Sequence, residues 1–145
     1  EIKQALARTK AEFGYAILLD AHSILSEVPR FFEGKLPDFN WGTANGRSCS
    51  PLILDALKNL NYESYSVVSN ERFKGGYITR EYGEPKNNIH AIQLELSQRT
   101  YMNEGELIFS EDLAEQVIPY LKNIVRELIQ FNPIVNSTIR SEGIK

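Results

Sequence analysis

The amino-acid sequence predicts an α/β fold, and two patterns carry that prediction. A continuous apolar run, Tyr15–Leu19, follows a segment with helical spacing, and such a short run is typical of a strand buried on both faces of a parallel sheet. In residues 89–96, polar and apolar side chains alternate instead. The alternation predicts a second strand that places Gln93 and Glu95 on one face and His90 on the other.

The other elements are predicted from helical spacing and capping residues. Ser50, followed by a proline, is a favourable helix start, and Ser110 is a capping hydroxyl before two acidic residues that suit a helix dipole. Pro119 falls inside the last helix, so we expect it to kink that helix or to start a second one. The expected elements are helices over residues 2–13, 51–60 and 111–131 and a short strand over residues 65–68.

Two stretches without periodicity separate these elements. Residues 29–50 are irregular but carry four aromatic side chains, so we interpret them as an ordered loop over a site. Residues 70–80 combine two adjacent glycines with cationic side chains and are interpreted as a turn. The polar segment Asp20–Ser23 directly follows the first apolar run, and the carboxyl end of such a strand is where open α/β sheets bind ligands.

Composition excludes several classes of function. The chain has 145 residues, one cysteine and a formal net charge of -3, so we expect no disulfide framework and no electrostatic footprint for nucleic acid or an anionic membrane. No apolar run approaches the ~20 residues of a membrane span. We therefore expect a soluble cytoplasmic protein. Its two histidines, His22 and His90, cannot build a three-histidine zinc site.

His22 is the first candidate for chemistry. Its imidazole is a potential metal ligand, and the Asp20 carboxylate two residues earlier is suited to orient it by a hydrogen bond. The alternative is a structural histidine held by hydrogen bonds, which is the commoner role of a single histidine. A further arrangement joins His22 and His90 with a carboxylate such as Asp20, although His90 is predicted to face the core.

Glu95 is the second candidate. Burying an unpaired carboxylate in an otherwise apolar strand is costly, so the side chain must be solvated, paired or used. One interpretation is a general base beside a metal-bound water. The alternative is an edge strand whose polar residues, Gln93 and Glu95, simply face solvent.

Cationic side chains around the two glycines form a third candidate group. Guanidinium groups bind carboxylates in a bidentate way, so a flexible loop that carries two of them suits a small acidic molecule. The alternative is ordinary surface charge. The cationic residues concerned are Arg72, Lys74, Arg80 and Arg99.

Four segments of the chain share their order and residue types with one enzyme family. They are FGYAILLDAHSI at 13–24, GKLPDFN at 34–40 with the Gly-Thr pair at 42–43, RFKGGYITR at 72–80 with the Tyr-Gly pair at 82–83, and HAIQLEL at 90–96 with RTYM at 99–102. Together they resemble the N-formylglutamate deformylase family, also called N-formylglutamate amidohydrolases. The likeness extends over residues 13–131, which is most of the chain.

The resemblance implies a fold, a site and a reaction. The family resembles zinc carboxypeptidases (phosphorylase/hydrolase-like), with a three-layer mixed sheet flanked by helices and a divalent metal, zinc in the first place, at the carboxyl ends of central strands. His22 matches the last metal ligand and Glu95 the general base. Arg72, Gly76 and Arg80 match the loop that binds the substrate carboxylates. The implied reaction is hydrolysis of N-formyl-L-glutamate to formate and L-glutamate, in histidine degradation.

Members of the family are considerably longer at the amino end. The resemblance therefore implies that residues 1–132 are the carboxyl-terminal part of the family's domain, followed by a tail over residues 133–145. It also implies that the first histidine, an acidic ligand and an Asn-Arg pair belong to the missing amino-terminal half of the same protein. Two alternatives stay open: an amidohydrolase for another N-acyl amino acid, and a non-catalytic fragment that binds carboxylates.

Overall fold

The computed structural model of the chain describes residues 1–133, so the predicted tail lies outside the described residues except for Pro133. Within this range, four strands form one mixed sheet in the order β1-β4-β2-β3, and two short strands form a separate hairpin. The strands are β1 Ala16–Ile24, β2 Phe39–Gly42, β3 Val67–Ser69, β4 Ile89–Ser97, β5 Met102–Asn103 and β6 Ile108–Phe109. The helices are α1 Ile2–Phe13, α2 Pro51–Lys58, α3 Tyr77–Tyr82 and α4 Glu111–Gln130, with 3₁₀ turns at Pro85–Asn87 and Gln98–Thr100.

β4 is an inner strand of the sheet. It pairs in parallel with β1 and antiparallel with β2, which in turn pairs in parallel with β3. The two faces predicted for β4 are confirmed, because Ile92 and Leu94 belong to the hydrophobic core whereas Gln93 and Glu95 line a cavity. The alternative in which β4 is an edge strand is wrong.

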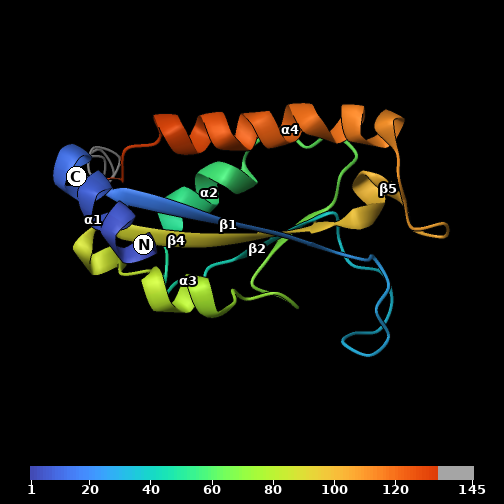
Figure 1. The fold of residues 1–145 in the computed structure, drawn as a ribbon, viewed down its shortest axis with the longest axis horizontal. Coiled ribbons are helices and arrows are strands. Elements are labelled where there is room, and N and C mark those ends of the chain that lie inside the picture. The colour runs from blue at the N-terminus through green and yellow to red at the C-terminus, as the bar shows by residue number, and fades with distance from the viewer. Residues whose placement is uncertain (134–145) are drawn as a thin grey trace, which may run out of the picture.

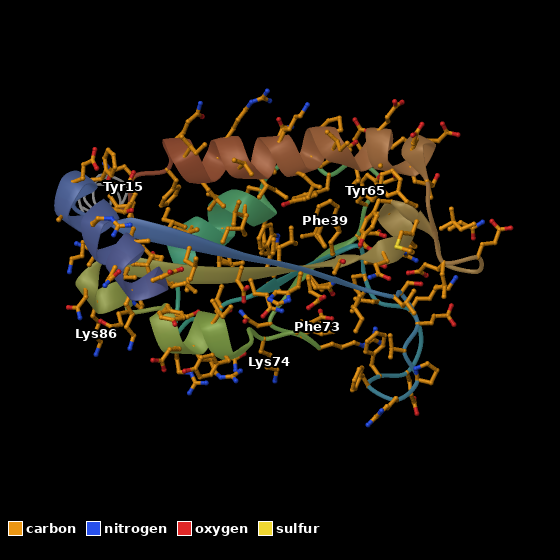
Figure 2. All side chains as sticks on the ribbon, viewed as in Figure 1. Tyr15, Phe39, Tyr65, Phe73, Lys74 and Lys86 are labelled. Atoms are coloured by element: carbon orange, nitrogen blue, oxygen red, sulfur yellow. The ribbon has the colours of Figure 1, made fainter. Side chains whose placement is uncertain are left out.

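Helices cover both faces of the sheet. Figure 1 shows α2 and α4 on one side of it and α3 on the other. The core between the sheet and the first pair includes Ile53 and Leu57 of α2 and Val117 and Ile124 of α4. Figure 2 shows Phe39 and Tyr65 on this side of the sheet, while Phe73 and Lys74 lie on the opposite side. No helix within residues 1–133 combines the length and apolarity needed to cross a membrane.

The prediction for the first strand is wrong in two respects. β1 continues to Ile24, so the polar segment Asp20–Ser23 is part of the strand instead of following it. β1 also lies at the edge of the described sheet, and most of its side chains are half-buried or exposed. Its apolar run has another cause: Ile17 and Leu19 pack against the hydrophobic core, which covers one face of the strand.

Two elements occupy stretches for which the sequence predicts no regular structure. β2 lies within residues 29–50, and its sequence FNWG has no strand period, so its conformation depends on pairing with β4 and β3. α3 begins within the glycine-broken segment 70–80 and continues to Tyr82, and its six residues are too few to show a helical period. β3 covers residues 67–69, two positions beyond the start of the predicted strand.

α4 begins as predicted but does not break. The Ser110 hydroxyl caps it by accepting a hydrogen bond from the Leu113 N–H. Pro119 neither divides the helix nor starts a second one, because Glu111–Gln130 is one continuous element. A proline removes one backbone hydrogen bond, and here Val117 and Ile124 are buried in the core on either side of it.

Acid should destabilise the fold through His90. This side chain is 2% exposed, its Nδ1 accepts a hydrogen bond from the Ser50 N–H, and burial lowers its pKa below the ordinary 6.5. The unfolded chain binds the proton at higher pH than the folded chain. The contribution of His90 to the free energy of unfolding should therefore fall as the pH drops below about 6.5, by up to about 1.4 kcal/mol per pH unit until the lowered pKa is reached.

Urea unfolding between about pH 5 and pH 7.5 measures this slope. The variant His90→Gln keeps an acceptor for the Ser50 N–H and should lose the contribution. The control His22→Gln should retain it, because His90 is still present. A slope in His90→Gln as steep as that of the unmodified chain would contradict the assignment.

Candidate functional site

The pairing of β1 with β4 brings the two principal candidates together. In this parallel register His22 lies opposite Glu95, and Asp20 lies opposite Gln93. All four side chains line one cavity of about 500 Å³. The other walls of the cavity come from the loop and the start of α3, namely Arg72, Phe73, Lys74, Gly75, Gly76, Tyr77 and Ile78.

His22 is oriented by a carboxylate. Its Nε2 lies 2.8 Å from Asp20 Oδ1, and the His22 side chain is 47% exposed against 9% for Asp20. An ionised carboxylate only accepts hydrogen bonds, so Nε2 is the donor of this bond, and in the neutral imidazole the lone pair then lies on Nδ1. The pair thus has the carboxylate–histidine arrangement that fixes the tautomer of metal-binding histidines.

Glu95 is a buried carboxylate in the wall of the cavity. It is 6% exposed, and burial raises its pKa, while His22 and a hydrogen bond from Gln93 partly oppose that shift. The Gln93 Nε2 donates to Glu95 Oε2 at 3.1 Å. A carboxylate whose pKa is raised towards the working pH is suited to accept and return a proton during a reaction.

Arg72 lines the cavity and also joins two loops. Its guanidinium donates to the carbonyl oxygens of Lys35 at 2.8 Å and Glu33 at 2.7 Å, and it lies 5.0 Å from the centre of the Phe32 ring. These bonds use two of the five N–H donors of a guanidinium. The remaining donors are the ones with which Arg72 can meet a carboxylate in the cavity.

Arg80 and Gly76 are placed differently from Arg72. The Arg80 guanidinium donates to the Gly75 carbonyl at 2.6 Å and lines a neighbouring, smaller cavity of about 190 Å³ together with Ala44, Arg47 and Ser48. Gly76 lies in the wall of the larger cavity, and its N–H donates to Gln93 Oε1 at 2.6 Å. The structure therefore gathers His22, Glu95, Arg72 and Gly76 around one cavity and leaves the Arg80 side chain beside it.

A metal fits this donor set only in part. His22 and Asp20 provide an imidazole and its orienting carboxylate, but no group of three or more His, Cys, Asp or Glu side chains within residues 1–133 is arranged to hold a metal ion. The arrangement of His22, His90 and Asp20 is not formed, since His90 is buried on the other face of β4.

Several residues that line the cavity are not among the candidates predicted from the sequence, and the two with polar side chains are Gln93 and Tyr77. Gln93 is 5% exposed and bonds both Gly76 and Glu95. Its position on the Glu95 face of the strand was the available signal. Tyr77 lines the cavity from the first turn of α3, a helix with no sequence signal.

Comparisons with known proteins identify the family. The family profile that matches residues 1–102 is that of N-formylglutamate amidohydrolase. The chain belongs to this family. The N-formylglutamate deformylase of Pseudomonas putida is 50% identical over 131 residues, which are 88% of this chain and 49% of that protein. The deformylase of Pseudomonas aeruginosa is 52% identical over 132 residues, which are 89% of this chain and 48% of that protein.

A solved member of the N-formylglutamate amidohydrolase family shares the fold. The crystal structure of the amidohydrolase from Ralstonia eutropha JMP134 matches with a TM-score of 0.73 and 25% identity, over 86% of this chain and 47% of that one. The predicted family and the mixed sheet with flanking helices are thereby confirmed. The chain spans about half the length of the relatives it matches.

The position of the loop 74–76, which forms part of the cavity wall, depends on the absence of a side chain at Gly42. A Cβ at Gly42 would lie 2.5 Å from the Gly75 backbone nitrogen and 2.8 Å from the Lys74 carbonyl carbon. The variant Gly42→Ala should therefore displace the loop and lower the free energy of unfolding by about 1–3 kcal/mol, the usual cost of overpacking. Urea unfolding measures the change.

A glycine in the β5–β6 hairpin provides the matched control. A Cβ at Gly105 would meet only Asn103 Oδ1, at 3.5 Å, which is an ordinary contact. The variant Gly105→Ala should change the free energy of unfolding by less than about 0.5 kcal/mol. Equal losses in the free energy of unfolding in the two variants would show that the position of the loop does not depend on Gly42.

Proposed function

We propose that the complete protein containing this chain hydrolyses N-formyl-L-glutamate to formate and L-glutamate, as a cytoplasmic step of histidine degradation. The observation that carries the proposal is the pairing of His22 with Glu95 in one cavity that Arg72 also lines. Membership of the N-formylglutamate amidohydrolase family supports it. Relatives about half identical to this chain are named N-formylglutamate deformylase. We extend the proposal to a zinc-carboxypeptidase-like fold for the complete domain.

Glu95 is the general base of the proposed reaction. Its carboxylate takes a proton from the water whose oxygen attacks the formyl carbon. The carbon–nitrogen bond then breaks, and the same carboxyl group delivers the proton to the leaving amine, so that formate and glutamate are the products. A positioned group of this kind contributes about 10²–10⁴ in rate.

The cationic loop binds the two carboxylates of the substrate in this proposal. Arg72 has guanidinium donors left after its bonds to Lys35 and Glu33, and Lys74 adds a positive charge to the same cavity. Arg80 holds the Gly75 carbonyl and thereby shapes the loop next to Gly76. A dianionic substrate matches a cavity wall with this charge.

A divalent metal, zinc in the first place, completes the proposed site. The chemistry that it supplies when bound is a lower pKa of the attacking water, about 7, and polarisation of the formyl oxygen. His22 would hold it through Nδ1, and Asp20 would orient the ring. The further ligands come, in this proposal, from the amino-terminal half of the same protein. The position of β1 supports this origin of the ligands. Within residues 1–133, β1 pairs with another strand on one side only, and an open strand edge is where further strands pair.

One observation favours a second function for the 145 residues alone. Without a three-ligand group within residues 1–133, the isolated chain would bind carboxylates without catalysis.

A substrate other than the formyl compound is tested by comparing turnover of N-formyl and N-acetyl glutamate by the longer protein. Faster turnover of the acetyl compound would replace the proposed substrate by another N-acyl amino acid.

The variant Glu95→Gln in the longer protein should lower kcat for N-formylglutamate by about 10²–10⁴, because the amide cannot accept the proton of the attacking water. Release of formate measures the rate, and metal analysis checks that the metal content is unchanged. The control Glu115→Gln removes an exposed carboxylate of α4 and should leave kcat at its original value. A Glu95→Gln enzyme with the original kcat would refute the general-base assignment.

The variant Asp20→Asn should weaken metal binding in the longer protein by about 10–100-fold, because the His22 ring loses its orienting carboxylate. Zinc affinity measured by competition with a chelator tests this. Asp112→Asn, which removes an exposed charge at the start of α4, is the matched control and should bind zinc normally. Unchanged affinity in Asp20→Asn would show that Asp20 does not support a metal ligand.

A further inference from the structure

Hydrogen bonds to its backbone hold the loop 74–76 in place over the sheet. The Ala44 N–H donates to the Lys74 carbonyl at 2.5 Å, and Arg80 donates to the Gly75 carbonyl at 2.6 Å. Gly75 has φ 109°, a conformation that is readily open only to glycine. Gly42 lies opposite Gln93 in the β2–β4 register, and its missing side chain lets the loop approach the sheet at this point.

The amide of Gln93 connects this loop to Glu95. Its Oε1 accepts the Gly76 N–H at 2.6 Å, and its Nε2 donates to Glu95 Oε2 at 3.1 Å. The orientation of the amide follows from chemistry, because a backbone N–H only donates and must face the oxygen. The amino group then necessarily faces the carboxylate, which is the acceptor.

The bridge distinguishes the two oxygens of Glu95. Oε2 receives the hydrogen bond from Gln93, whereas Oε1 receives none from any residue in the range 1–133. Gln93 is 5% exposed and Glu95 is 6% exposed, so water has little access to replace this hydrogen bond. The carboxylate is thus held by one oxygen and leaves the other for a proton.

We propose that Gln93 is a positioning residue that couples the 74–76 loop to the general base: it fixes Glu95 through Oε2, directs Oε1 to the reacting water, and ties this arrangement to the loop that binds substrate. The inference rests on the proposed role of Glu95. It goes beyond that role, because it names the group that orients the base. The competing explanation is that Gln93 only satisfies a buried N–H.

Two variants of the longer protein separate the halves of the bridge. Gln93→Glu keeps an oxygen acceptor for the Gly76 N–H and replaces the amide donor by a second carboxyl group, which must share a proton with Glu95 and so removes its free carboxylate. Gln93→Met fills a similar volume and loses both bonds. Ser97→Ala is the control, since Ser97 is a fully buried residue of β4 outside the cavity.

A positioning role predicts a loss of kcat in both variants, by about 10–100-fold, a part of what a general base contributes. KM should rise only in Gln93→Met, because only that variant removes the acceptor of the Gly76 N–H and so loosens the loop that binds substrate. Ser97→Ala should keep both constants. Retention of the original kcat by either Gln93 variant would overturn the proposal, because the donor to Glu95 would then be dispensable.

A spectroscopic measurement on the 145-residue chain tests the bridge independently of turnover. The Gly76 amide proton and nitrogen resonances should move in Gln93→Met and stay near their original positions in Gln93→Glu. Unmoved resonances in Gln93→Met would overturn the bridge itself. If the bridge is present but Glu95→Gln retains full turnover, the proposed function of Glu95 fails, and that failure is distinguishable from failure of the bridge.

Discussion

Parallel pairing between β1 and β4 is the constraint on which the candidate site depends. A slip of one residue would turn every β1 side chain to the other face of the sheet, and His22 would leave Glu95. The apolar face prevents the slip, since Leu19 pairs with Ile92 in this register and both contact the core beneath α2 and α4. Each such side chain contributes about 1.5–3 kcal/mol on full burial. Packing of the apolar face in the core therefore also sets the alignment of the side chains on the polar face.

The polar face is stable because its buried groups are paired. Asp20 accepts from His22, and Gln93 both accepts from Gly76 and donates to Glu95. A buried polar group without a partner costs about 1–3 kcal/mol, so each of these bonds offsets a cost of forming the cavity. The same bonds restrict the orientation of the side chains. Stability and chemical pre-organisation thus have a common origin in this part of the molecule.

The sequence predicts this site better on strands than on loops. Period-two alternation assigned Glu95 and His90 to opposite faces of β4, because one face of that strand is core and the other is not. The apolar run of β1 could not reveal an edge position, since one covered face already explains it. The place of the Arg80 guanidinium depends on α3, which begins directly after the loop that approaches the sheet at Gly42. Such long-range contacts leave no local pattern.

Exposure across the cavity indicates where the site is open. Glu95 on the inner strand is 6% exposed, whereas the His22 side chain on the edge strand is 47% exposed. A metal ion bound by His22 would need further ligands, and on the side of His22 towards the inner strand β4 the neighbouring position is already occupied by Glu95. Additional ligands would therefore have access from the edge of β1 that is unpaired within residues 1–133. This asymmetry supports the proposal that a segment pairing beyond β1 completes the site, because one added strand would cover the edge and bring its own side chains to His22.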